Sequence, residues 1–193
     1  PLALWRATVH AAGAYRYQAV HVDGQSVYTN NCYSGAYRGF GNTEAAAAIE
    51  QAIDEFAISL GQDPMEFRLR NIVRNNGDTV MTGNKLNQEV GLAECIRWVR
   101  ERSDWDQKRA KYQNQSGDIR RGIGVACYMH GSSLGGEGAD FATTTLRVET
   151  DNTIMVTSGL TDYGQGSRTV FALVAAETLG LDYKRIRIGN TDT

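Results

Sequence analysis

The fold is decided by residues 36–71, which read AYRGFGNTEAAAAIEQAIDEFAISLGQDPMEFRLRN. Apolar side chains recur at three- and four-residue spacing over residues 43–60, and this spacing predicts an amphipathic helix. Asn42 or Thr43 can cap the start of this helix, and Gly61 can close its end. The opposite face of the helix carries the acidic side chains of Glu50, Asp54 and Glu55.

Two further helices are predicted after this one. Asp63 suits the N-cap and Pro64 the first helical position, so a second helix should run to about Val73. Residues 92–102 place their apolar side chains on one face and predict a third helix. Residues 104–120 are polar and poor in aliphatic side chains, which is typical of a helical tail that continues into a linker.

Other segments favour strands. Residues 15–22 and 25–29 flank the turn dipeptide Asp23-Gly24, and this arrangement predicts a β-hairpin. Towards the C-terminus we predict a helix over residues 167–179, ended by Gly180. Strands are predicted around it at residues 122–129, 143–149, 153–158 and 184–188.

These elements indicate an α+β fold with two lobes of mixed sheet and helices. The first lobe, residues 1–103, holds the hairpin, a glycine-containing loop and three helices, and residues 104–120 are the helical tail and linker. Residues 121–193 begin a second α+β lobe, which we expect to be truncated at its C-terminus.

Composition excludes several classes of protein. With 41% hydrophobic and 22% charged residues and a net charge of −2, the chain resembles ordinary globular domains and has no basic patch for nucleic acid. No apolar run reaches the ~20 residues of a membrane span. The cysteines Cys32, Cys95 and Cys127 are odd in number and widely spaced, so we expect no disulfide framework, no metal held by the chain, and a reducing, cytoplasmic setting.

Two segments share one design, a glycine-containing loop that leads directly into a helix start. They are residues 38–43, RGFGNT, and residues 161–167, TDYGQGS. Helix starts leave backbone N–H groups unpaired, and glycines let the backbone approach a ligand, so either loop could hold an anionic group. Alternatively, the glycines only satisfy turn geometry. Neither run matches the Walker or dinucleotide fingerprints.

Individual side chains leave alternatives open. Phe40 could stack on a flat substrate or pack locally, and Arg38 could pair with an anion or with a carboxylate of the following helix. Residues 131–138 are rich in glycine, as ligand-approaching loops and linkers both are. No residue pattern indicates a catalytic triad.

Three sequence motifs resemble those of one known family. AYRGFG at residues 36–41, DPMEFRLRN at residues 63–71 and GLTDYGQGSRT at residues 159–169 are similar, in this order, to the molybdopterin-binding subunit of the xanthine dehydrogenase and aldehyde oxidase family. The resemblance spans essentially the whole chain and implies part of the molybdenum-cofactor-binding domain of a molybdenum hydroxylase. Such enzymes hydroxylate an N-heteroaromatic, purine-like substrate with oxygen from water. Electrons pass to iron–sulfur clusters and usually to FAD, carried on other domains or subunits.

The resemblance also implies site residues. By position in the motifs, the cofactor-binding residues are Arg38, Gly39, Gly164, Gln165 and Gly166. The substrate-binding residues are Phe40, which would stack on the substrate, and Arg6, which would orient it.

The chain departs from the family pattern in several places. Thr43-Glu44 replaces a glutamine that many members carry, and residues 160–162 read LTD in place of Gly-Thr-Glu. The chain also stops before the family's glycine–glutamate–proline run, which carries the glutamate that acts as general base. We therefore expect no catalytic residue in this chain and no activity from it alone. Two alternatives stay open: the same fold acting on an aldehyde, nicotinate or an aromatic acyl thioester, or a non-catalytic interaction domain.

Overall fold

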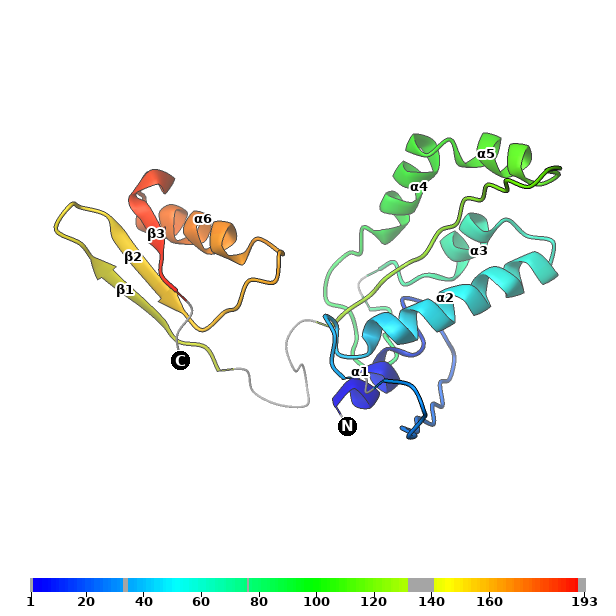
Figure 1. The fold of residues 1–193 in the computed structure, drawn as a ribbon, viewed down its shortest axis with the longest axis horizontal. Coiled ribbons are helices and arrows are strands. Elements are labelled where there is room, and N and C mark those ends of the chain that lie inside the picture. Colours follow the sequence, from blue (N-terminus) through cyan, green and yellow to red (C-terminus); the bar gives the residue numbers. More distant parts are fainter. Residues whose placement is uncertain (1, 33–34, 76, 132–140, 191–193) are drawn as a thin grey trace. The chain divides into compact units, whose positions relative to one another are not determined.

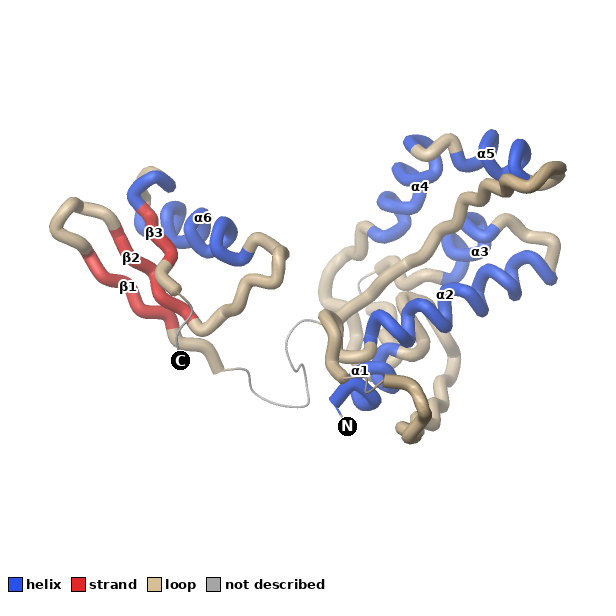
Figure 2. Tube along the Cα trace, viewed as in Figure 1, coloured by secondary structure: helices blue, strands red, loops and turns tan. Residues whose placement is uncertain are grey.

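The computed structural model describes residues 2–32, 35–75, 77–131 and 141–190, which form two compact units (Figure 1). Unit 1 is Pro1–His130 and unit 2 is Gly131–Thr193, and each is described by itself. Most of the helices lie in unit 1, whereas unit 2 combines strands with one long helix (Figure 2). Within the described ranges, no helix has the length and apolar character that crossing a membrane requires. The glycine-rich residues 132–138 lie outside the described residues.

The helices of unit 1 agree closely with the sequence predictions. Their bounds are α1 Leu2–His10, α2 Asn42–Ser59, α3 Pro64–Asn71, α4 Leu92–Arg102 and α5 Trp105–Tyr112. Helix α3 ends before Val73, because Ile72 leaves the helix in an extended conformation and pairs with Tyr15. Helix α1, which the sequence did not indicate, packs against α2.

Asp63 joins α3 to α5. Its Oδ1 accepts hydrogen bonds from the N–H groups of Met65 and Glu66 at 3.0 and 3.1 Å, as an N-cap residue does. Its Oδ2 accepts a third hydrogen bond from the Trp105 Nε1 at 2.9 Å, and Trp105 is buried in the core of unit 1. The polar stretch 104–120 therefore opens with a helix of unit 1, in line with the predicted helical tail, and the two compact units divide after His130.

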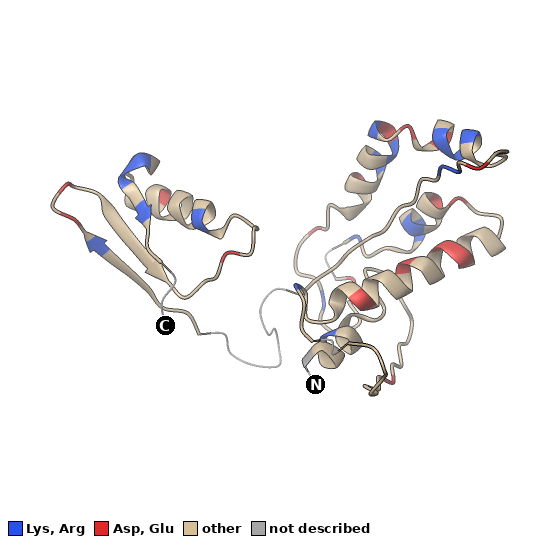
Figure 3. Cartoon of the chain, viewed as in Figure 1, with Lys and Arg blue, Asp and Glu red and all other residues tan. Residues whose placement is uncertain are grey.

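Charged side chains also hold these helices together. Figure 3 shows acidic residues along α2 and many basic residues on α4 and α5. Arg100 of α4 forms ion pairs with Glu66 of α3 and, at 2.7 Å, with Asp106 of α5. One guanidinium thus links three helices.

The predicted hairpin was wrong. Residues 15–29 form no strand, and Tyr15 pairs instead with Ile72, which lies 57 positions further along the chain. Gly24 is not in the left-handed conformation that a type I′ turn needs. A Cβ there would lie 2.4 Å from Thr8 Oγ1 of α1, so Gly24 serves a close approach to that helix.

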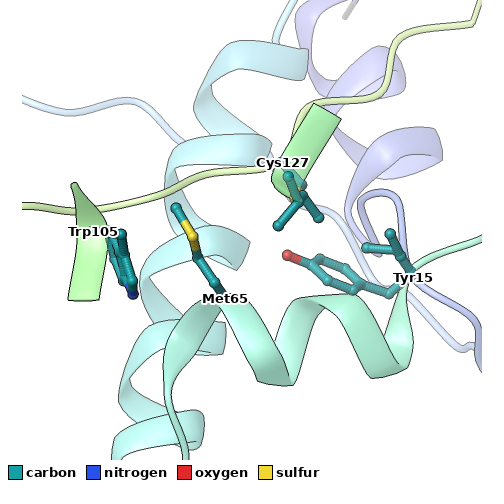
Figure 4. Close-up of a cluster of buried hydrophobic side chains, with 6 residues drawn as sticks. Tyr15, Met65, Trp105 and Cys127 are labelled. Carbon is teal, nitrogen blue, oxygen red and sulfur yellow. The ribbon is translucent and has the colours of Figure 1, made fainter. Parts of the chain in front are cut away.

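Residues 122–129 also differ from the prediction, because they form no strand and belong to unit 1. Cys127 is buried there with Tyr15, Met65 and Trp105 (Figure 4). Its backbone N–H donates to Glu50 Oε2 at 2.8 Å, so a side chain of α2 takes the place of a neighbouring strand. The apolar residues of this segment complete the core of unit 1.

Unit 2 is a small three-stranded sheet with one helix. Strands β1 Thr144–Val148 and β2 Ile154–Ser158 are antiparallel, and β3 Ile186–Ile188 runs parallel to β2. Helix α6 Ser167–Leu179 ends at Gly180 as predicted, and the short 3-10 helix η2 Tyr183–Arg185 precedes β3. The core contains Ile154, Val156, Ala172, Ala176 and Ile186. The strand predicted at residues 184–188 is shorter than expected, because residues 183–185 form the 3-10 helix. The strand predicted at residues 143–149 is present as β1, and all of its residues are exposed.

Candidate functional site

The RGFG loop, residues 38–41, is a tight turn in front of α2. Gly39, Phe40 and Gly41 have φ angles of 113°, 55° and 96°, all in the left-handed region. The Phe40 N–H donates to the Tyr37 carbonyl at 2.8 Å, and the Asn42 N–H donates to the Gly39 carbonyl at 3.1 Å. Phe40 is 48% exposed, so its ring is free to contact a ligand and is not part of the core.

Gly41 presses the loop onto α1. A Cβ on Gly41 would lie 2.1 Å from the Ala3 carbonyl oxygen, so no larger residue fits without moving the backbone. Arg6 lies three residues after Ala3, on the same face of α1. The structure therefore brings the helix that carries Arg6 to the RGFG loop. The Arg6 guanidinium lies over the Trp5 ring, 4.5 Å from its centroid.

Asn42 does not cap α2 as predicted. The N-cap is Gly41, which makes no side-chain capping bond, and the Asn42 side chain is 1% exposed. Its Nδ2 donates to Tyr128 Oη at 3.1 Å and to the Met129 carbonyl at 2.9 Å. Thr43, the other predicted cap, donates its hydroxyl hydrogen to Glu44 at 2.8 Å. The first N–H groups of α2 are therefore left without a side-chain cap.

The GQG loop, residues 164–166, has the same relation to α6. Gly164 and Gly166 have φ angles of 100° and 80°, and Gly166 is the N-cap without a side-chain capping bond. A Cβ on either glycine would meet no described atom within 4 Å. The backbone of both glycines therefore faces open space, and their role in cofactor binding stays a prediction.

Gln165 braces its own loop. Its Oε1 accepts a hydrogen bond from the Tyr163 N–H at 2.6 Å. Its Nε2 donates to the Thr161 carbonyl at 2.9 Å and to Ser167 Oγ at 2.7 Å. These bonds fix the shape of the GQG loop, and contact between Gln165 and a cofactor stays a prediction.

Asp162 is a loop residue whose role the sequence did not reveal. Its carboxylate accepts the N–H groups of Gly164 at 2.8 Å and Arg168 at 3.3 Å. These backbone hydrogen bonds, Gly164 first, hold the pKa of Asp162 below its ordinary value. In the sequence, Asp162 stands five residues before the start of α6, where an acidic side chain can reach the first turn of the helix, and this position could have indicated its role.

A buried polar cluster lies beneath α2. Glu50 accepts the Tyr15 hydroxyl at 2.6 Å through Oε1, and Arg68 Nε at 2.9 Å through Oε2. Arg68 also donates to Asp54 Oδ1 at 2.5 Å, and its side chain is 0% exposed. Burial, followed by the hydrogen bond to Glu50, raises the pKa of Tyr15. Burial also raises the pKa of the Cys127 thiol to about 11. Both groups stay neutral near pH 7, so the cluster is a structural support.

The predicted residues fall into two groups. Unit 1 holds Arg6, Arg38, Gly39 and Phe40, with the last three on one exposed turn next to α1. Unit 2 holds Gly164, Gln165 and Gly166.

Comparison with known protein families identifies the family of this chain. Two models of the family described as molybdopterin cofactor-binding domain match residues 1–72 and 98–193. The chain therefore belongs to the molybdopterin cofactor-binding domains of the xanthine dehydrogenase and aldehyde oxidoreductase large-subunit family. The two matched regions each contain one of the glycine loops.

Individual proteins similar to this molybdopterin-binding domain support the family assignment. The xanthine dehydrogenase molybdenum-binding subunit of Escherichia coli O157:H7 is 39% identical over 178 residues, which are 92% of this chain and 23% of that protein. The nicotinate dehydrogenase large molybdopterin subunit of Eubacterium barkeri is 41% identical over 103 residues, 53% of this chain and 24% of that protein. The solved quinoline 2-oxidoreductase of Pseudomonas putida 86 matches with a TM-score of 0.75 and 27% identity, over 97% of this chain and 25% of that one. This chain spans about a quarter of the length of each of them.

The residues present fit a pterin cofactor with anionic oxygens. Both loops open helices whose N-cap residue is a glycine, which adds no side chain at the positive end of the helix dipole. At α6 the Asp162 carboxylate already accepts the Arg168 N–H, so the donors that stay available to a cofactor oxygen there are the other backbone N–H groups of the helix start. Arg38 is exposed beside the first helix start, and the glycines of the second loop leave open space beside them.

Proposed function

We propose that this domain helps to hold the molybdenum–pterin cofactor of a hydroxylase that acts on an N-heteroaromatic, purine-like substrate. The observation that carries the proposal is the repeated design of the two loops. Each is rich in positive-φ glycine, and each opens a helix whose N-cap residue is a glycine. When bound, the cofactor supplies oxygen transfer from water and accepts two electrons.

The residues of this chain would bind the cofactor and orient the substrate. Arg38 would hold an anionic oxygen by charge and hydrogen bonding, with Gly39 allowing close approach of the backbone. Gly164 and Gly166 would do the same at α6, and Gln165 would keep the GQG loop in shape or contact the cofactor through its amide. Phe40 would present its exposed ring face to a flat substrate.

Arg6 would orient the substrate through an oxo or carboxylate group. Its helix lies against the RGFG loop at the Gly41–Ala3 contact, which supports this role. The names of the three relatives given above involve xanthine, nicotinate and quinoline, all flat nitrogen heterocycles. These names support a heteroaromatic substrate, and an aldehyde stays the alternative, because the aldehyde oxidoreductase of Megalodesulfovibrio gigas is also similar to this chain.

The proposed overall reaction converts a ring C–H group and one water molecule into a ring C–OH group, and it releases two protons and two electrons. The electrons would pass to iron–sulfur clusters and then to a flavin, on other domains or on partner subunits. None of the site residues above is proposed as the group that takes a proton from the reacting oxygen.

The function is tested with the full-length natural subunit and its natural partners. The purified enzyme is offered hypoxanthine, nicotinate, quinoline and benzaldehyde in water enriched in oxygen-18, with a dye as electron acceptor. The proposal predicts a hydroxylated heterocycle that carries the label. Turnover of benzaldehyde alone would contradict the substrate class, and product labelled from dioxygen would contradict the reaction type.

A further inference from the structure

Asn42, the first residue of α2, connects the RGFG loop to the rest of unit 1. Asn42 is 1% exposed, and both hydrogens of its amide are used, one by Tyr128 Oη and one by the Met129 carbonyl. The Asn42 backbone N–H donates to the Gly39 carbonyl within the loop. One residue therefore connects the loop to a segment that lies 86 positions further along the chain.

Tyr128 also lies close to the loop itself, at Gly39. Its hydroxyl oxygen lies 3.4 Å from the position that a Cβ on Gly39 would occupy. Its ring is stacked near His130, with centroids 6.4 Å apart, and His130 is stacked with His10 of α1 at 5.1 Å. The Tyr128 hydroxyl is thus placed between Asn42 and the turn that presents Arg38 and Phe40.

The segment that carries Tyr128 is itself held in place by α2. The Cys127 N–H donates to Glu50 Oε2, and Glu50 lies about two turns after Asn42 on the same helix. Two points of α2 therefore fix residues 127–129. Glu50 forms the buried ion pair with Arg68, whereas Asn42 forms the hydrogen bonds that join residues 128 and 129 to the start of α2.

From these contacts we propose that Asn42 and Tyr128 are positioning residues that hold the RGFG loop in its functional conformation, an inference that rests on the proposed function. Phe40 has a left-handed φ of 55°, which a bulky residue keeps only where its surroundings enforce it. The Gly41–Ala3 contact and the Asn42–Tyr128 hydrogen bond are what enforce it. Tyr128 is 49% exposed, so its hydroxyl contributes little to the core.

The test compares variants of the full-length, cofactor-loaded subunit. Tyr128→Phe removes one hydroxyl and keeps the ring, and Asn42→Ala removes the amide. Tyr183→Phe in unit 2, where the ring is 44% exposed, is the matched control. Hydrogen exchange of the peptide covering residues 36–45 and steady-state kinetics on a heteroaromatic substrate are measured together with molybdenum content and thermal unfolding.

The proposal predicts exchange about tenfold faster in residues 38–42 for Asn42→Ala, and a smaller acceleration in the same direction for Tyr128→Phe. It also predicts kcat lower by about tenfold in Asn42→Ala, since a misplaced loop misaligns the substrate. Tyr183→Phe should match the wild type in every measurement. If Asn42→Ala does not fold, Tyr128→Phe decides the question.

Unchanged exchange and unchanged kcat in Tyr128→Phe, with an active and molybdenum-loaded wild type, would overturn the positioning role and leave the proposed function standing. A wild type without molybdenum would instead overturn the proposed function, and this inference with it.

Discussion

Arg68 donates from its Nε to Glu50 Oε2 at 2.9 Å, and both side chains are buried in unit 1. The same carboxylate accepts the Tyr15 hydroxyl and the Cys127 N–H. Four segments far apart in sequence therefore meet at one carboxylate. The sequence places Glu50 on the acidic face of α2, and its buried position is explained by these three donors, of which Arg68 alone is charged.

Removal of Arg68 should destabilise the domain strongly. Arg68→Ala leaves Glu50 buried without its charged partner, a change that typically costs about 3–5 kcal/mol. Arg70→Ala, on the same helix but exposed, should cost less than about 1 kcal/mol. Thermal unfolding of the full-length subunit measures both, and equal shifts would show that the buried pair has no special role.

Gly41→Ala should disable the RGFG loop. The new Cβ would collide with the Ala3 carbonyl oxygen, and the φ of 96° is strained for any L-residue. Displacement of the loop by about 1 Å would lower kcat/KM on the order of 100-fold. Gly61→Ala has a similar positive φ but no atom within 4 Å, so it is the control for strain alone. If both variants kept full activity, the close packing on α1 would be irrelevant to function.

Phe40→Ala should raise the KM for flat heterocycles. The loss of one aromatic contact is worth about 0.5–1.5 kcal/mol, which corresponds to a rise of up to about tenfold. The KM of a small aliphatic aldehyde, if it is turned over, should change much less. Phe141→Ala, at an exposed ring in unit 2, controls for general effects. An unchanged KM for the heterocycle would argue against stacking.

Stability should fall in acid through His10. Burial, reinforced by the charges of His130 and Arg6, lowers the pKa of His10 below its ordinary value of 6.5, so the folded state favours the neutral ring. The unfolded chain binds the proton more readily, and stability is therefore full above pH 6.5 and decreases as the pH falls below it. His10→Gln should flatten this part of the pH profile of the melting temperature, whereas His21→Gln, at an exposed site, should not. A profile unchanged by His10→Gln would exclude His10 as the cause.

Elements with purely local signals were predicted well from the sequence. The bounds of α4 and α6, the Asp63 cap and the Gly180 end follow from side-chain spacing and from residues within one turn. The two glycine loops were found for the same reason, because their glycines stand directly before helix starts.

Features that depend on distant partners were not predicted. The strand-like residues 15–22 pair through Tyr15 with Ile72, and Cys127 bonds to a side chain of α2. Asn42 looks like an ordinary cap until its partners at residues 128 and 129 are known. A sequence pattern specifies that a group needs a partner, but not which distant residue supplies it.

The central claim is that the RGFG and GQG loops hold the molybdenum–pterin cofactor, and its most direct test is the molybdenum and pterin content of the full-length subunit. We would compare the wild type with the Arg38→Ala/Gln165→Ala double variant. Arg97→Ala/Gln51→Ala, which changes exposed residues of the same types, is the control. The account predicts about one molybdenum per wild-type and control subunit, and a loss of both metal and pterin in the loop variant. Full loading of a folded loop variant would contradict it.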